Sequence, residues 1–177
     1  MVYSRSWYGS HSFLNDYILL NKCRIIMEIG IADGENAKRM VTVASNNFPA
    51  EMVEYYGFDL FGWNGDSQMK RVLKKLKATG CRFKLFRGDS TITLPKIEDL
   101  PMMDLIFIDG GHSYPTVKSD WENVKTLMHD ETAVFFHNYD FSGPKRVVDN
   151  ISRDEYDVKI IYPPSDSATA RVKKGGF

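Results

Sequence analysis

The chain has 177 residues, enough for one domain with its own core, and we expect a single domain over 1–177. Lys plus Arg and Asp plus Glu both total 23, so the overall charge gives no reason to expect nucleic acid or an anionic membrane as a partner. The two cysteines, Cys23 and Cys81, match neither a disulfide framework nor a paired metal motif. No apolar run approaches the roughly 18 residues of a membrane span, and no signal peptide is evident, which indicates a cytoplasmic protein.

Apolar runs typical of buried strands recur along the chain, separated by stretches long enough for crossover helices. This spacing predicts a parallel sheet with helices on both faces, because such crossovers are right-handed. Gln68 to Ala78 is the clearest helix, with an apolar stripe among lysines. The first five expected strands are Arg24–Ile29, Met52–Phe58, Arg82–Phe86, Asp104–Ile108 and Thr132–Phe136.

Two further strands are expected near the end, Tyr156–Tyr162 and Ala168–Lys173, after a short helix near Lys145–Ile151. Their closeness in sequence predicts an antiparallel pair at one edge of the sheet. The segment Pro163–Ser167 between them is predicted to be an exposed loop.

The first strand ends in Glu28-x-Gly30-x-x-x-Gly34, with Ile31 inside the turn. Glycines there let the backbone turn sharply and approach a ligand, and open α/β sheets bind ligands at this edge. Ala32 occupies the second glycine position of a dinucleotide fingerprint, which excludes that motif. We expect Glu28, Gly30, Ile31 and Gly34 to contact a cofactor.

Acidic residues surround this turn, since Asp33 and Glu35 accompany Glu28. Three carboxylates oppose a diphosphate and suit a ligand that carries an ammonium and a sulfonium group. S-adenosylmethionine has both groups. The turn therefore favours this cofactor over NAD or a nucleoside triphosphate.

The next two strands end in acidic residues as well. Asp59, followed by Leu60, lies where an acidic residue reaches the ribose hydroxyls of a bound nucleotide. Gly88-Asp89-Ser90 follows the third strand and suits an adenine ring. For both aspartates the alternative is a helix cap or a loop contact.

Aromatic residues near these loops suggest cover for a ligand, although packing is the commoner role of such side chains. Phe61 and Trp63 follow the ribose aspartate and are candidates to cover the adenine. Trp7 and Tyr8 belong to an amino-terminal extension, residues 1–22, that we expect to act as a lid.

The densest motif follows the fourth strand, where Ile108 to Tyr114 reads I-D-G-G-H-S-Y. With the glycine turn, Asp59, Gly88-Asp89-Ser90 and Phe136-His137-Asn138, this ordered set resembles the class I S-adenosylmethionine-dependent methyltransferases from about Arg24 to the end. It is most similar to the macrocin-type small-molecule O-methyltransferases, with catechol O-methyltransferase a more distant relative. The resemblance implies a Rossmann-like α/β fold with a seven-stranded, mostly parallel sheet and an antiparallel last strand. It also implies a small-molecule acceptor and cofactor contacts from Asp109, Gly110 and His112.

The resemblance further implies a divalent cation, magnesium, held by Asp109, Asn138 and Asp140. Asn138 stands where relatives of this type carry aspartate, and one charge fewer weakens a magnesium site. If the fifth strand stays extended past Phe136, Asn138 and Asp140 share a face and His137 points away from the site. We therefore expect His137 to be a packing residue, or a residue that supports the ligands from outside, rather than a ligand.

His112 lies three residues after Asp109, where catechol O-methyltransferase has its general-base lysine, so the resemblance implies His112 and Asp109 as catalytic residues. A histidine accepts an alcohol proton as the methyl group arrives. The alternative is that His112 only orders the loop or binds the cofactor.

Three functions stay open: O-methylation of a small hydroxylated molecule, another S-adenosylmethionine reaction such as N-methylation or cofactor cleavage, and a non-catalytic binding module. The acceptor, and whether the chain forms a homo-oligomer, have no signal in the sequence.

Overall fold

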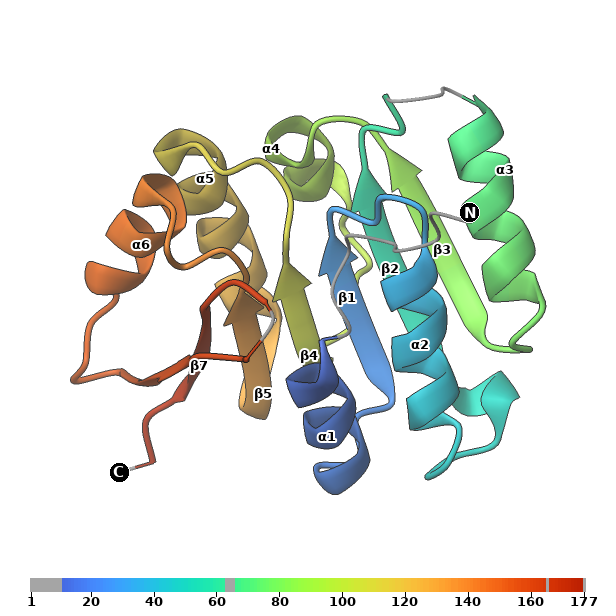
Figure 1. Ribbon diagram of the computed structural model, residues 1–177, viewed down its shortest axis with the longest axis horizontal. Helices are drawn as coiled ribbons and strands as arrows, with labels where there is room; N and C mark the ends of the chain where they lie inside the picture. The colour runs from blue at the N-terminus through green and yellow to red at the C-terminus, as the bar shows by residue number, and fades with distance from the viewer. Residues whose placement is uncertain (1–10, 63–65, 165, 177) are drawn as a thin grey trace.

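The computed structural model describes residues 11–62, 66–164 and 166–176, and they form one seven-stranded sheet flanked by helices (Figure 1). The strands are β1 (Ile25–Ile29), β2 (Glu54–Asp59), β3 (Arg82–Arg87), β4 (Met103–Ile108), β5 (Met128–Phe136), β6 (Tyr156–Ile161) and β7 (Thr169–Lys174). The helices are α1 (Ser12–Leu20), α2 (Glu35–Ala44), α3 (Asp66–Lys77), α4 (Ser90–Thr93), α5 (Tyr114–Val124) and α6 (Ser142–Asp149), with 3₁₀ turns at Ala50–Met52, Leu94–Lys96 and Lys125–Leu127.

The strand order is β3-β2-β1-β4-β5-β7-β6. β1 to β5 pair in parallel, and β7 runs antiparallel to both of its neighbours, β5 and β6. This confirms the predicted fold class and the edge pair formed by the last two strands. The main difference is β5, which begins at Met128 rather than Thr132, because Met128 pairs with Met103 before a register shift in β4.

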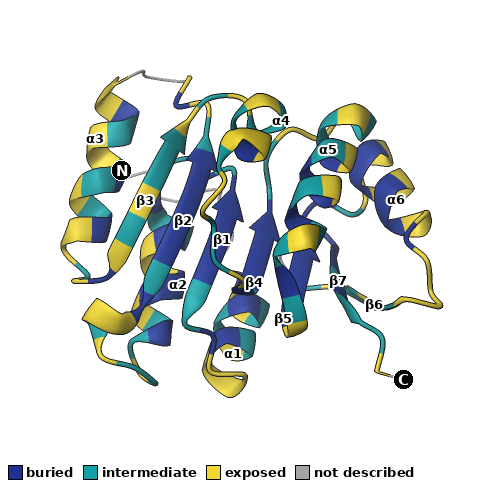
Figure 2. Ribbon diagram, turned by 180° about the vertical axis from the view of Figure 1, so that it is seen from behind, coloured by how far each residue is buried: buried dark blue, intermediate teal, exposed yellow. Residues whose placement is uncertain are grey.

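Two apolar clusters cover the two faces of the sheet. One packs α1, α2 and α3 against one face, and the other packs α5 and α6 against the opposite face. In Figure 2 the central strands are mostly buried, while the helices turn exposed residues outward. The predicted apolar stripe on α3 is confirmed, since the side chains of Val72 and Leu76 are fully buried. Continuous apolar strands are what two covered faces require.

Hydrogen bonds beyond the strands hold the carboxyl ends of neighbouring strands together. Four backbone N–H groups donate to the adjacent strand: Gly30 to Phe58 O (2.8 Å), Asp109 to Ile29 O (2.8 Å), Gly88 to Asp59 O (3.0 Å) and His137 to Ile108 O (3.0 Å). The loops that follow β1, β3, β4 and β5 therefore begin from one fixed edge. This edge is where parallel sheets of this kind bind ligands.

Candidate functional site

A cavity of about 610 Å³ opens at the carboxyl edge of the sheet. Its size is that of a ligand site. Most of the predicted cofactor residues line it, namely Gly30, Asp59, Leu60, Gly88, Asp89, Ser90, Asp109, Gly110 and His112. The structure thus brings together residues from the ends of four strands, β1 to β4, that the sequence could only order along the chain.

Three predicted cofactor residues, Glu28, Ile31 and Gly34, are not part of the cavity lining. The Ile31 side chain is buried in the core on the α2 face of the sheet. Gly34 caps α2 with φ +78° and lies against Val72 of α3. These three residues therefore support the glycine turn on the side away from the cavity, while Gly30 and Ala32 line the cavity.

The acidic residues around the glycine turn do not face the cavity, contrary to the argument that favoured a cationic ligand. Asp33 and Glu35 form ion pairs with Lys75 of α3, at 3.3 and 2.8 Å. Glu28 is buried and accepts hydrogen bonds from Tyr55 and from Asn36. Sequence spacing placed these carboxylates near the turn but not on its ligand side.

Other carboxylates line the cavity instead: Asp59, Asp89, Asp109 and Asp166. Among the described residues that line it there is no lysine or arginine. The wall therefore carries a surplus of negative charge, which attracts a cationic ligand and repels a polyphosphate. The cavity therefore has the expected preference for a cationic ligand, but this preference comes from other carboxylates than those around the glycine turn.

Glu28 lies fully inside the protein, between β1 and α2. Burial raises the pKa of its carboxyl group to about 8, against the hydrogen bonds from Tyr55 and Asn36, which lower it. A neutral Glu28 still accepts both bonds, so it acts as a packing and hydrogen-bonding residue beneath the glycine turn.

We expect Glu28→Gln to remove a pH-dependent loss of stability. Between pH 4.5 and about 8 the folded chain holds the Glu28 proton and the unfolded chain releases it. The wild type therefore loses stability as pH rises through this window, by an amount on the order of a few kcal/mol. Urea unfolding at pH 5 and pH 8 measures the difference. If the free energy of unfolding changes with pH by the same amount in the variant and the wild type, Glu28 is ionised in the folded protein and the prediction is wrong.

Asp59 fastens the glycine turn to β2. Its Oδ2 accepts the N–H groups of Ile31 (2.8 Å) and Ala32 (3.0 Å), and its Oδ1 accepts that of Phe61 (2.5 Å). The same carboxylate lines the cavity. The loop-contact interpretation of Asp59 is therefore confirmed. Its role as a ribose ligand stays a prediction for an acid that also lines the cavity.

Asp89 is likewise a helix cap that lies at the cavity, and its contact with the adenine ring stays a prediction. Its Oδ1 accepts the Thr91 N–H at 2.9 Å and so caps α4, while the residue lines the cavity together with Ser90. A cap fixes the side chain in place. The carboxylate is thereby held at the ligand space rather than free to rotate.

The Phe61 side chain does not lie over the cavity. Its side chain is fully buried in the core on the α2 face, and its backbone has φ +49°. The left-handed turn points the ring inward, and its neighbours Leu60 and Gly62 line the cavity instead. Trp63, Trp7 and Tyr8 lie outside the described residues.

Asp109 and His112 flank one end of the cavity. His112 Nε2 lies 3.8 Å from Asp109 Oδ1, and the His112 ring meets Phe141 edge-on, with centroids 4.9 Å apart. The start of α6 supports this loop, because a Cβ on Gly143 would lie 2.0 Å from the His112 carbonyl oxygen. His112 keeps 39% of its side chain exposed, so it is accessible to a bound acceptor.

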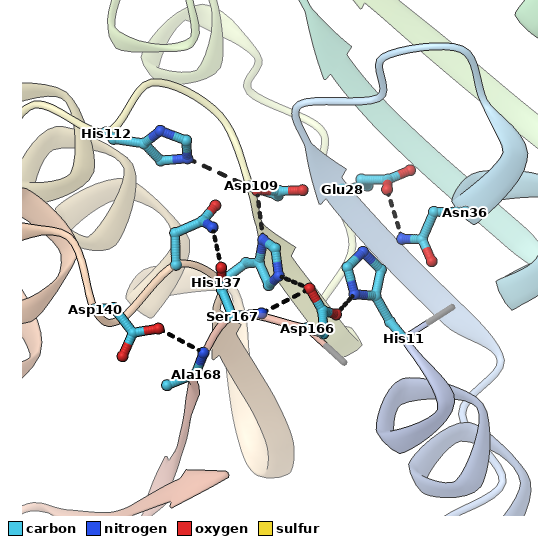
Figure 3. A network of polar contacts seen from close by, with 11 residues as sticks. His11, Glu28, Asn36, Asp109, His112, His137, Asp140, Asp166, Ser167 and Ala168 are labelled. Atoms are coloured by element: carbon cyan, nitrogen blue, oxygen red, sulfur yellow. Dashed lines mark hydrogen bonds and ion pairs between the residues drawn. The ribbon is translucent and has the colours of Figure 1, made fainter. Parts of the chain in front are cut away.

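His137 points toward the site, contrary to expectation. β5 ends at Phe136, and Asn138 adopts φ +53°, so the chain does not stay extended and the alternation argument fails. His137 Nδ1 lies 2.9 Å from Asp109 Oδ1, and Nε2 lies 3.0 Å from Asp166 Oδ1 (Figure 3). Burial acts to lower the pKa of His137, but these two carboxylates raise it above its ordinary value.

Contacts with histidines stabilise the charged form of Asp109. Burial acts to raise its pKa, yet His112, His137 and His11 together lower it. Asp166 behaves alike, its pKa lowered by His137 and His11. Both carboxylates are therefore anionic at neutral pH.

The three residues predicted to bind magnesium do not all converge, since only Asp109 and Asn138 line the cavity. Asp109 Oδ1 faces His137, while the Asn138 amide donates to Ser167 Oγ at 2.9 Å. Asp140 accepts the Ala168 N–H at 2.9 Å and is not part of the cavity lining. Figure 3 shows the Asp140 carboxylate turned toward Ala168 and away from Asp109. Without Asp140, the predicted set offers one carboxylate and one amide oxygen, which is few ligands for magnesium.

Two residues of the site had no useful sequence signal. His11 precedes α1 and stands alone in a segment that matched no motif. Asp166 lies in the loop predicted to be exposed, yet only 12% of its side chain is accessible, because it lies between the two histidines. A polar loop gives no indication that one of its carboxylates is buried.

A ligand cavity at the carboxyl edge of a parallel sheet places the chain among the ligand-binding α/β proteins. The family model "Methyltransferase domain" matches residues 27–139, and the chain belongs to this family. The predicted enzyme class, a methyltransferase, is thereby confirmed. A search of curated proteins gave no significant match.

Solved structures agree on the fold. The O-methyltransferase TomG from Streptomyces achromogenes, in complex with SAM, is 15% identical with a TM-score of 0.74 over 93% of this chain and 78% of that one. An O-methyltransferase from Bacillus cereus in complex with SAH is 15% identical with a TM-score of 0.70, over 97% and 84%. A putative rRNA methylase from Clostridium thermocellum is 12% identical with a TM-score of 0.70, over 95% and 97%.

Within the described residues, no helix has the length and apolarity to cross a bilayer.

Proposed function

We propose that this protein is an S-adenosylmethionine-dependent O-methyltransferase that acts on a small hydroxylated molecule in the cytoplasm. The observation that carries the proposal is the cavity wall, which presents four aspartates and no basic side chain among its described residues. A sulfonium ion beside an ammonium group is the cofactor chemistry that such a wall favours. The solved O-methyltransferases bound to SAM or SAH share the fold and support this choice.

In this proposal the protein acts mainly by positioning. Asp59 and Asp89 hold the adenosine part of the cofactor, and the edge near Asp109 receives its methionine part. The acceptor hydroxyl then lies beside His112, so that methyl transfer runs in line from sulfur to oxygen. His112 Nε2 accepts the hydroxyl proton, and anionic Asp109 stabilises the imidazolium that forms. No step passes through a magnesium ion.

A small acceptor suits the charge of the site better than RNA does. Binding RNA relies on lysine and arginine contacts with phosphates. The cavity wall instead offers aspartates. The putative rRNA methylase among the structural neighbours makes RNA the acceptor to test against this conclusion.

Calorimetric titration tests the cofactor. We expect S-adenosylmethionine and S-adenosylhomocysteine to bind, NAD not to bind, and magnesium to make no difference. Asp89→Asn keeps the helix cap but removes a charge, so it is expected to weaken binding about tenfold, the loss of one charge-assisted hydrogen bond. Asp99→Asn, at an exposed position outside the cavity lining, is the matched control. Binding of NAD alone would overturn the cofactor assignment.

A methyl-transfer assay with labelled cofactor tests the acceptor. Hydroxylated small molecules, matched amines and total RNA are offered separately, and cofactor breakdown without an acceptor is recorded. Transfer to hydroxyl compounds supports the proposal. Transfer only to amines or RNA, breakdown alone, or tight binding with no consumption would each contradict it.

A further inference from the structure

Three side chains from distant parts of the chain meet at one end of the cavity. His11 precedes α1, His137 follows β5 and Asp166 lies between β6 and β7 (Figure 3). His11 Nδ1 lies 2.7 Å from Asp166 Oδ2, and His137 Nε2 lies 3.0 Å from Asp166 Oδ1. One ligand atom from each residue lies within 4.8 Å of the other two. Bonds of about 2.0–2.2 Å hold two ligands of one ion at most about 4.4 Å apart, so the ligand atoms need to close by no more than a few tenths of an ångström to share an ion.

Each ring nitrogen of His137 faces a carboxylate, and this restricts what can lie between them. Nδ1 faces a carboxylate oxygen of Asp109, and Nε2 faces one of Asp166. Carboxylates accept hydrogen bonds and donate none, so each nitrogen requires a proton or a cation between it and its carboxylate. Asp109 accepts the Nδ1 proton, which directs Nε2 toward Asp166 and His11. Proteins orient metal-binding histidines with an outer carboxylate in this way.

We propose that His11, His137 and Asp166 bind a divalent cation of the zinc class, with Asp109 orienting His137. Two imidazole nitrogens and one carboxylate oxygen suit zinc or cobalt, whereas magnesium and calcium prefer oxygen ligands alone. This site is distinct from the magnesium set implied by the resemblance, which shares none of the three ligands.

The surroundings of the cluster favour a bound cation. All three ligands are largely shielded from solvent, with side-chain exposures of 5%, 9% and 12%. They line the same cavity, where no lysine or arginine of the described part of the chain competes with a positive ion. Three protein ligands leave at least one coordination position for water or for a ligand oxygen. The ion joins the segment before α1 to the loops after β5 and β6, and so closes one end of the cavity.

Equilibrium dialysis of the full, metal-stripped chain against zinc tests this site. We expect one tightly bound zinc per chain in the wild type. His11→Ala and Asp166→Ala are each expected to weaken binding by more than about 100-fold, since losing an outer-shell partner already costs about 10–100-fold. His129→Ala is the matched control, because His129 pairs with Asp104 near the amino ends of β4 and β5. Cobalt in place of zinc is expected to give visible absorption bands that both site variants lose.

Two results would overturn the proposal. One is a wild-type chain that binds no zinc, in which case a doubly protonated His137 alone links the two aspartates. The other is zinc binding that His11→Ala and Asp166→Ala leave unchanged. Urea unfolding of each variant shows whether it is folded. S-adenosylmethionine titration on the same samples tests the proposed function separately, since neither result depends on the other.

Discussion

Replacing His112 by alanine is expected to lower turnover by about 100- to 10,000-fold, the range for loss of a general base. The affinity for S-adenosylmethionine is expected to change little, because the proposed function assigns the adenosine part of the cofactor to Asp59 and Asp89, which line the cavity as well. The His112 backbone stays supported by Gly143, so the loop keeps its position. Steady-state kinetics together with calorimetry separate the two effects.

Two comparisons sharpen the His112 experiment. His129→Ala removes a histidine outside the cavity lining and is expected to leave turnover unchanged. Imidazole added to His112→Ala is expected to restore part of the rate, since a free base can enter a half-exposed site. If His112→Ala keeps full turnover, His112 is a loop residue and the base assignment is wrong.

Replacing Gly30 by alanine is expected to destabilise the fold by at least about 3 kcal/mol or to prevent folding. A Cβ at this position would lie 2.1 Å from the Asp109 carbonyl oxygen, and the backbone has φ +89°. The nearest atoms belong to the backbone of Asp109 and Gly110, directly after the neighbouring strand β4, so no side chain can move aside. A strained conformation adds about 1–3 kcal/mol to the steric cost.

Gly62→Ala is the matched control, because among the described residues an added Cβ there meets only Leu60 Cβ, at 3.8 Å. We expect it to change stability by no more than about 0.5 kcal/mol. Urea unfolding of both variants gives the difference. If the Gly30→Ala protein has wild-type stability, the backbone at Gly30 does not lie as close to the Asp109 carbonyl as the structure shows.

The strands and their mostly parallel arrangement could be predicted because burial on both faces leaves a local trace. β1 and β4 are mostly apolar runs, and Gly30 after β1 and Asp109 and Gly110 after β4 line the cavity at the predicted edge. The apolar stripe of α3 was equally local. Periodicity of this kind depends on neighbouring residues alone.

Predictions about individual side chains failed where one backbone torsion decides the outcome. Phe61 and Asn138 both adopt positive φ, although neither is glycine. The first turns its own ring into the core. The second ends the extended conformation, and His137 next to it faces Asp109. Residue type does not encode such torsions, because surrounding tertiary contacts hold them in place.

The sequence by itself determined the sheet, its flanking helices and the ligand edge, since these follow from local apolar patterns and from motif order. Only the tertiary structure decided which carboxylates face the cavity and which are buried or paired elsewhere. It also joined His11 to Asp166, 155 positions apart, and placed His137 between Asp166 and Asp109. A contact across that distance depends on the path of the whole chain, and no short stretch of sequence records it.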